Sequence, residues 1–177
     1  MRSAVVLLVV VLWLPALTLA QESENPFDVT ALREMTGGAG VPDVARVAEL
    51  ESAALAAVDA GDCQVAVVRL DEYARAANAL ANFVAAGLEP FYNALPDDRR
   101  GFGGVATLLT FETLSNEYKS KRNRAMVMRA ECFLRIGDRD QAVENFYQAL
   151  RILDIDDGEW WTRARTGLYS ILGVSAR

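Results

Sequence analysis

Residues 125–156 read AMVMRAECFLRIGDRDQAVENFYQALRILDID, and this stretch decides the fold. Its apolar residues recur three and four positions apart, which predicts two amphipathic helices. Between them lies Gly137-Asp138, where glycine can take the left-handed conformation that ends a helix. Asp138 followed three residues later by Gln141 has the form of a capping box that opens the next helix. The stretch therefore predicts a helical hairpin.

Small and aromatic residues alternate along this hairpin at a spacing that resembles the tetratricopeptide repeat. In that family, small residues let paired helices approach closely and aromatic residues fill the space between them. The residues that carry the resemblance are Ala130, Phe133, Gly137, Ala142, Phe146 and Ala149. Met126, Arg129 and Asp154 depart from the family's pattern, and Ala130 stands for its glycine, so the repeat is degenerate. The resemblance implies an all-α fold, a short right-handed solenoid of antiparallel helix pairs.

An earlier stretch repeats several features of the hairpin. A shift of 76 residues places Gly61 on Gly137 and Ala66 on Ala142. This separation predicts a further degenerate repeat between the two, lengthened by a loop at residues 96–104. We expect about six helices, with a helix-to-helix connection at the basic residues 119–124. Among the expected helices are residues 63–86, 105–118 and 159–172.

Composition limits the possible functions. The 177 residues, 52% hydrophobic and 24% charged, are typical of one globular domain. A net charge of −6 argues against a nucleic-acid binder, because neutralising phosphates needs an excess of basic side chains. The chain has no histidine, which removes the commonest general base and metal ligand. We therefore expect no enzyme activity, no cofactor and no metal.

The amino-terminal residues have the parts of a secretory signal. Arg2 precedes an apolar run, and small residues at Thr18 and Ala20 precede a polar stretch. We expect a signal peptide over residues 1–20, cleaved after Ala20, and hence a periplasmic or secreted protein. The alternative is an uncleaved membrane anchor, against which Pro15 interrupts the run.

The residues after the expected signal peptide divide into a tether and a domain. Residues 21–42 are rich in glycine near their end and predict a flexible tether. Residues 43–177 are expected to form the tetratricopeptide-like repeat domain.

The two cysteines, Cys63 and Cys132, are the whole cysteine content of the chain. An oxidising compartment would permit a disulfide. The repeat alignment places them on different helices, however, and packed helices lie ~8–10 Å apart against a bridging limit of ~7 Å between Cα atoms. We expect buried free thiols, with a disulfide as the alternative.

Clustered acidic residues do not form a calcium loop. Counted from Asp154, the glycine falls fifth rather than sixth, and the twelfth residue is Arg165 instead of glutamate. A solvated turn is the better interpretation. Asp97-Asp98 likewise carries no feature of a catalytic carboxylate pair.

A basic cluster stands out in this acidic protein: Lys119, Lys121, Arg122 and Arg124. Such a run is often only a solvated surface. The resemblance implies a concave groove lined by the first helix of each pair, which suits a peptide with acidic groups or a free carboxylate. The groove residues that it implies are Arg124, Val127, Glu131, Arg135, Trp161, Arg165 and Tyr169.

Two functions remain open from the sequence. The first is an interaction scaffold that binds a protein or peptide partner in the bacterial cell envelope, with no nucleic acid and no membrane contact beyond an uncleaved signal segment. The second is an accessory module that binds cell wall or polysaccharide through exposed aromatic residues. The aromatic residues in question are Trp160, Trp161, Phe91 and Tyr92.

Overall fold

The computed structural model describes residues 40–89, 106–153 and 157–175, and in these ranges the regular structure is entirely helical. This confirms the expected all-α class for the described part of the chain. None of the described helices is both long and apolar enough to span a membrane. The helices are α2 (Val44–Asp59), α3 (Cys63–Ala86), α6 (Ala106–Arg135), α7 (Arg139–Ile152) and α8 (Glu159–Leu172).

Several expectations fall on residues outside the described ranges. They concern the signal peptide over residues 1–20, most of the tether over residues 21–42, the loop at residues 96–104 and the aromatic pair Phe91 and Tyr92. The acidic residues Asp97, Asp98, Asp154 and Asp156 lie there too. These expectations stay predictions.

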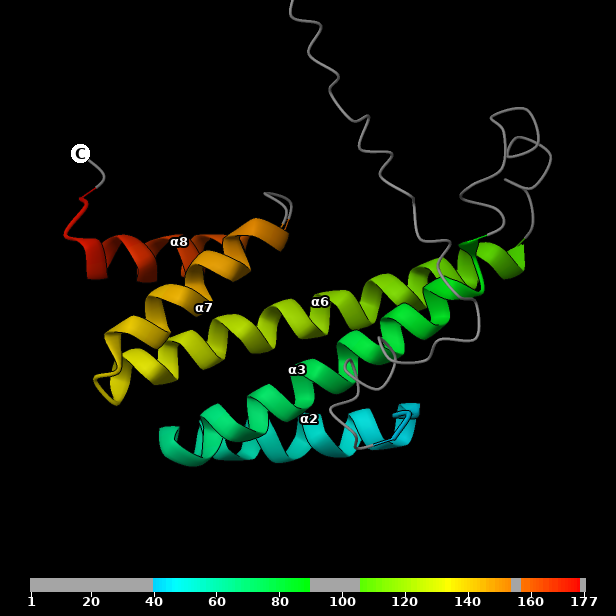
Figure 1. Ribbon diagram of the computed structural model, residues 1–177, viewed down its shortest axis with the longest axis horizontal. Helices are drawn as coiled ribbons and strands as arrows, with labels where there is room; N and C mark the ends of the chain where they lie inside the picture. The colour runs from blue at the N-terminus through cyan, green and yellow to red at the C-terminus, as the bar shows by residue number, and fades with distance from the viewer. Residues whose placement is uncertain (1–39, 90–105, 154–156, 176–177) are drawn as a thin grey trace, which may run out of the picture.

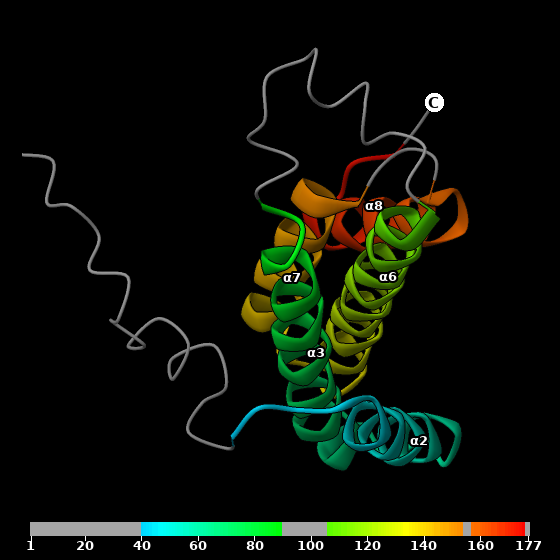
Figure 2. The same ribbon diagram turned by 90° about the vertical axis from the view of Figure 1, so that its right-hand side faces the viewer.

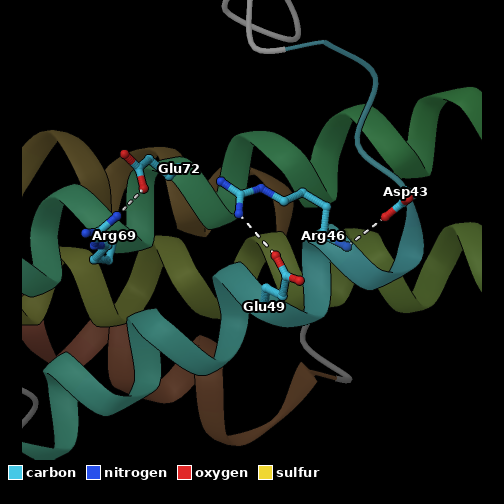
Figure 3. A network of polar contacts seen from close by, with 5 residues as sticks. All are labelled: Asp43, Arg46, Glu49, Arg69 and Glu72. Carbon is cyan, nitrogen blue, oxygen red and sulfur yellow. Dashed lines mark hydrogen bonds and ion pairs between the residues drawn. The ribbon is translucent and has the colours of Figure 1, made fainter.

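Aspartate side chains open three of the helices, because each carboxylate accepts a hydrogen bond from a backbone N–H that has no partner inside the helix. The bonds join Asp43 to Arg46 N at 2.7 Å, Asp62 to Val65 N at 3.1 Å and Asp138 to Gln141 N at 3.1 Å. Figure 3 shows the first of them, together with the exposed pairs Arg46–Glu49 and Arg69–Glu72. Local sequence therefore fixes where α2, α3 and α7 begin.

The turns at Gly61 and Gly137 have the same backbone hydrogen bonds. Both glycines have positive φ, 71° and 85°, the left-handed conformation that glycine adopts at little cost. In each turn, the N–H of the following aspartate donates back across the glycine in a Schellman motif. The matching bonds are Asp62 N to Ala57 O at 3.1 Å and Asp138 N to Phe133 O at 2.9 Å. The two turns therefore have the same backbone geometry.

The centre of the molecule is formed by α3 and α6, which run side by side in opposite directions (Figure 1). Helix α2 packs against α3 on one side of this pair, and α7 packs against α6 on the other. Helix α8 contacts both α6 and α7, and both views place α2 and α8 on opposite sides of the central pair (Figures 1 and 2). The other helices thus form two groups, α2 with α3 and α7 with α8, and α6 packs against both groups.

Small residues dominate the core. Each described helix has at least one fully buried alanine, which allows the helix backbones to approach closely. Large side chains fill the remaining space, with Leu70 and Tyr73 from α3 and Phe146 from α7. The buried Tyr73 hydroxyl donates to the Glu51 carboxylate at 2.7 Å, and Lys121 donates to the same carboxylate at 3.1 Å. This polar contact ties α2, α3 and α6 together.

The structure corrects one expected boundary. Residues 119–124 do not connect two helices, because α6 continues unbroken through them from Ala106 to Arg135. Lys121, Arg122 and Arg124 contact residues of other helices, so the charged run does not need a solvated turn. The described ranges contain five helices, compared with the expected six or so. The predicted helices at residues 63–86 and 159–172 have the observed bounds.

Candidate functional site

A hollow of about 420 Å³ opens between α6, α7 and α8. It combines an apolar floor with charged and hydroxyl-bearing walls, so it can take a group that has both an apolar and a polar part. Its lining residues are Glu131, Leu134, Arg135, Phe146, Thr162, Arg163, Thr166 and Gly167.

Close packing of Phe146 against Gly167 makes the floor of the hollow. Phe146 on α7 is fully buried, and a Cβ atom added to Gly167 would overlap its ring. Glycine inside a helix costs about 1 kcal/mol relative to alanine. Here that cost is offset because Gly167 lets α8 lie directly on the Phe146 ring.

An ion pair between Arg163 and Glu131 makes one wall. The Arg163 guanidinium donates to both carboxylate oxygens, from Nε at 2.9 Å and from Nη2 at 2.6 Å. This two-point geometry raises the pKa of Arg163 through the hydrogen bond to Glu131. The guanidinium also lies 4.1 Å from the ring centroid of Trp160. The Arg163 guanidinium therefore contacts both Glu131 and Trp160, and the Glu131 carboxylate balances its charge.

Arg135 brings a second positive charge to the same hollow. It is the last residue of α6, and its side chain is exposed. Within the described ranges, no ion pair or side-chain hydrogen bond is formed by Arg135. Thr162 and Thr166 on α8 add two hydroxyl groups nearby. A carboxylate entering the hollow would therefore meet a cation without a counter-ion and two possible hydrogen-bond donors.

Only two of the predicted groove residues, Glu131 and Arg135, line this hollow. Val127 is fully buried in the core, so its expected place on an open surface is wrong. The reason is that this face of α6 packs against other helices. Arg124 is exposed, as expected, and its guanidinium lies 5.9 Å from the Trp160 ring centroid.

The three groove residues predicted on α8 lie on another face of that helix. Trp161 is half-buried, with the Arg165 guanidinium 4.5 Å from its ring centroid, and Tyr169 is exposed. The hollow is lined instead by Thr162, Arg163, Thr166 and Gly167, which the sequence interpretation missed. The glycine in the middle of an otherwise good helix was the available signal, because it marks a close helix contact.

The basic cluster does not form one surface. Lys121 pairs with Glu51 and Glu117. Arg122 is half-buried and donates to amide oxygens of Asn78 and Asn123, and burial lowers its pKa. Arg124 alone of these three is exposed and lies toward Trp160. A continuous helix distributes these side chains around its axis, so they bind different partners.

In the described residues, no group of three or more His, Cys, Asp or Glu side chains is arranged to hold a metal ion. The hollow is the best-defined candidate site in the described residues, and it places the Arg135 guanidinium and two threonine hydroxyls beside apolar side chains. Neither protein-family models, nor curated proteins, nor solved structures give any match to this chain.

Proposed function

We propose that this protein is an exported interaction module that binds an acidic peptide segment of a partner protein in the cell envelope. The hollow between α6, α7 and α8 is the binding site in this proposal. It holds one carboxylate of the peptide, either from an acidic side chain or from the chain terminus.

The observation that carries the proposal is the contrast between two arginines at one hollow. Arg163 is neutralised by Glu131 through two hydrogen bonds, whereas Arg135 has no such partner in the described residues. A cation left without a counter-ion beside an apolar floor favours an anionic ligand with apolar neighbours.

The matched turns support a repeat architecture as part of the proposal. Gly61 and Gly137 close their helices with equivalent backbone bonds, and each is followed by an aspartate that caps the next helix. We infer that α2 with α3, and the end of α6 with α7, are degenerate tetratricopeptide-like pairs in a short right-handed solenoid. Helix α8 then serves as the closing cap, and the solenoid presents the hollow near its end.

The polysaccharide alternative has weaker support. Sugar-binding by stacking needs bare aromatic faces, but guanidinium groups lie over both neighbouring tryptophans. Arg163 is 4.1 Å from the ring centroid of Trp160, and Arg165 is 4.5 Å from that of Trp161. These contacts reduce the aromatic surface that a sugar ring could cover.

Three matched pools of fluorescent peptides test the proposal. The first has random sequences with free terminal carboxylates, the second has amidated termini, and the third also replaces Asp and Glu by Asn and Gln. Fluorescence anisotropy should show binding to the first pool that weakens as salt rises. Loss of binding in the second pool identifies a terminal carboxylate, and loss only in the third identifies an acidic side chain.

The matched variants are Arg135→Glu and Arg46→Glu. Both change one exposed arginine by the same charge, but Arg46 lies on α2, on the other side of the central helix pair. We expect Arg135→Glu to lower affinity at least about tenfold, because a truncated charged contact costs about 2 kcal/mol or more. Equal affinities for the two variants, or equal binding of all three pools, would remove the support for the proposal.

A further inference from the structure

The two cysteines of the chain face each other inside the core. Cys63 is the first residue of α3, and Cys132 lies three residues before the end of α6. Because α3 and α6 run in opposite directions, the start of one lies beside the end of the other (Figure 1). Their Sγ atoms are 2.8 Å apart, and both residues are buried, with 6% and 1% of their surface exposed.

This geometry corrects the sequence-based reason for keeping the two thiols apart. That reason used the usual ~8–10 Å separation of packed helix axes. Side chains that point toward each other across the contact shorten the separation at the sulfur atoms. A disulfide bond is about 2.05 Å long, so bond formation brings these sulfurs closer by only about 0.8 Å.

We propose that Cys63 and Cys132 form an intramolecular disulfide that staples the start of α3 to the end of α6. Each thiol gives up a proton, the two sulfurs join, and two electrons pass to a disulfide oxidant, either a thiol-disulfide exchange protein or oxidised glutathione. The oxidant's own S–S bond breaks and becomes two thiols. The exchange proceeds through a mixed disulfide that the second cysteine displaces.

The buried position determines when this bond can form. The thiolate is the reactive form of cysteine, and burial, followed by the hydrogen bond with Cys63, raises the pKa of Cys132 to about 12. At neutral pH the folded chain therefore holds very little thiolate at Cys132, and because both cysteines are buried the oxidant cannot reach the sulfurs directly. The bond should form while the chain is still folding. A chain that has folded with both thiols reduced should react only slowly with oxidant that is added afterwards.

The position of the bond also gives its expected effect. The cysteines are 69 positions apart, so the bond closes a long loop in the unfolded chain and restricts it strongly. Cys132 directly follows Glu131, which holds Arg163 at the hollow. For a domain of this size, we expect the bond to raise Tm by on the order of 10 °C.

A refolding experiment on the purified full chain tests the inference. One sample is unfolded, reduced and then refolded in a glutathione redox buffer, and another is folded in reductant before it meets the same buffer. Alkylation followed by mass spectrometry counts free thiols, and non-reducing peptide mapping identifies the linked peptides. The refolded sample should lose both thiols within one chain and melt higher than its reduced form, and the prefolded sample should react much more slowly.

The Cys63→Ala and Cys132→Ala variants are the controls, since alanine suits the apolar surroundings and leaves one thiol. Each should melt near the reduced wild type, with no change in Tm on adding reductant. Should either fail to fold, thiol counting on the wild type still decides the question. Two thiols that stay free after refolding, or that pair only between chains, would overturn the proposal.

Discussion

Arg163 on α8 holds the Glu131 carboxylate on α6 by two hydrogen bonds, of 2.9 and 2.6 Å, across the edge of the hollow. Both side chains are mostly buried, with 34% and 24% of their surface exposed. Bidentate charged pairs in such positions are stronger than exposed ones because water screens them less. This pair therefore has a structural role that can be separated from ligand binding.

A double-mutant cycle should measure that role. Glu131→Gln and Arg163→Gln, alone and together, should give a coupling free energy of about 1–2 kcal/mol from urea unfolding. The equivalent cycle on Arg46 and Glu49, an exposed pair one helical turn apart, should give about 0.3 kcal/mol. Similar coupling in the two cycles would show that the α6–α8 pair is no more than a surface contact.

Helix contact at Ala142 should make this position intolerant of a large side chain. Ala142 is fully buried on α7, so Ala142→Trp should overpack the contact and cost about 1–3 kcal/mol or more. Ala53→Trp introduces the same ring at an exposed position of α2 and should change stability by no more than about 0.5 kcal/mol. Thermal melts of the two variants give the comparison, and indistinguishable Tm values would argue against tight packing at Ala142.

Gly167→Ala should destabilise the protein although alanine is the better helix former. The added methyl group would overlap the Phe146 ring, which is fully buried and cannot swing away, at a cost of about 1–3 kcal/mol. Phe146→Leu removes the ring, so it should cost less in the Gly167→Ala background than in the wild type. Additive losses in chemical denaturation would contradict the close contact between these residues.

Stability should fall in alkaline solution because of Tyr73. Burial, then the hydrogen bond to Glu51, raises the pKa of Tyr73 above its ordinary value of about 10. Above that pH the unfolded chain loses the proton while the folded chain keeps it, so the unfolded state gains stability. The free energy of unfolding should therefore decrease more steeply above pH ~10 in the wild type than in Tyr73→Phe. Parallel curves from urea titrations across this range would disprove the linkage.

Peptide binding should distinguish the observed hollow from the groove predicted on α8. Trp161→Ala combined with Arg165→Glu alters residues that do not line the hollow, so acidic peptides should still bind with affinity within about threefold of wild type. Arg135→Glu should abolish most of that binding. The reverse pattern in anisotropy titrations, with circular dichroism unchanged, would return the binding site to the Trp161 face.

Helix ends could be predicted well because their signals are local. Asp62 and Asp138 cap helices through bonds to residues three positions away, so the sequence alone contains the interaction. The course of α6 could not be predicted in the same way. Lys121 pairs with Glu51, 70 positions away, and a sequence does not show that such a partner will be near.

The candidate site was predicted only in part for a related reason. Glu131 and Arg135 follow from the hairpin, but the orientation of α8 depends on the Phe146–Gly167 contact and on the Arg163–Glu131 pair. Both are long-range packing relationships. Thr162 and Thr166, each one position after the predicted Trp161 and Arg165, therefore line the hollow in their place.

The unbroken course of α6 has a mechanical consequence. At 30 residues α6 is about 45 Å long and forms one continuous helix. In the first half of the helix, Ser115 donates to the Ala81 carbonyl of α3 at 3.0 Å, and near its C-terminal end Glu131 is bonded to α8. A sharp kink between these points would break backbone hydrogen bonds of the helix, at about 1 kcal/mol each. The α8 contact at the hollow and the Ser115–Ala81 contact with α3 are therefore held at a fixed distance along one helix.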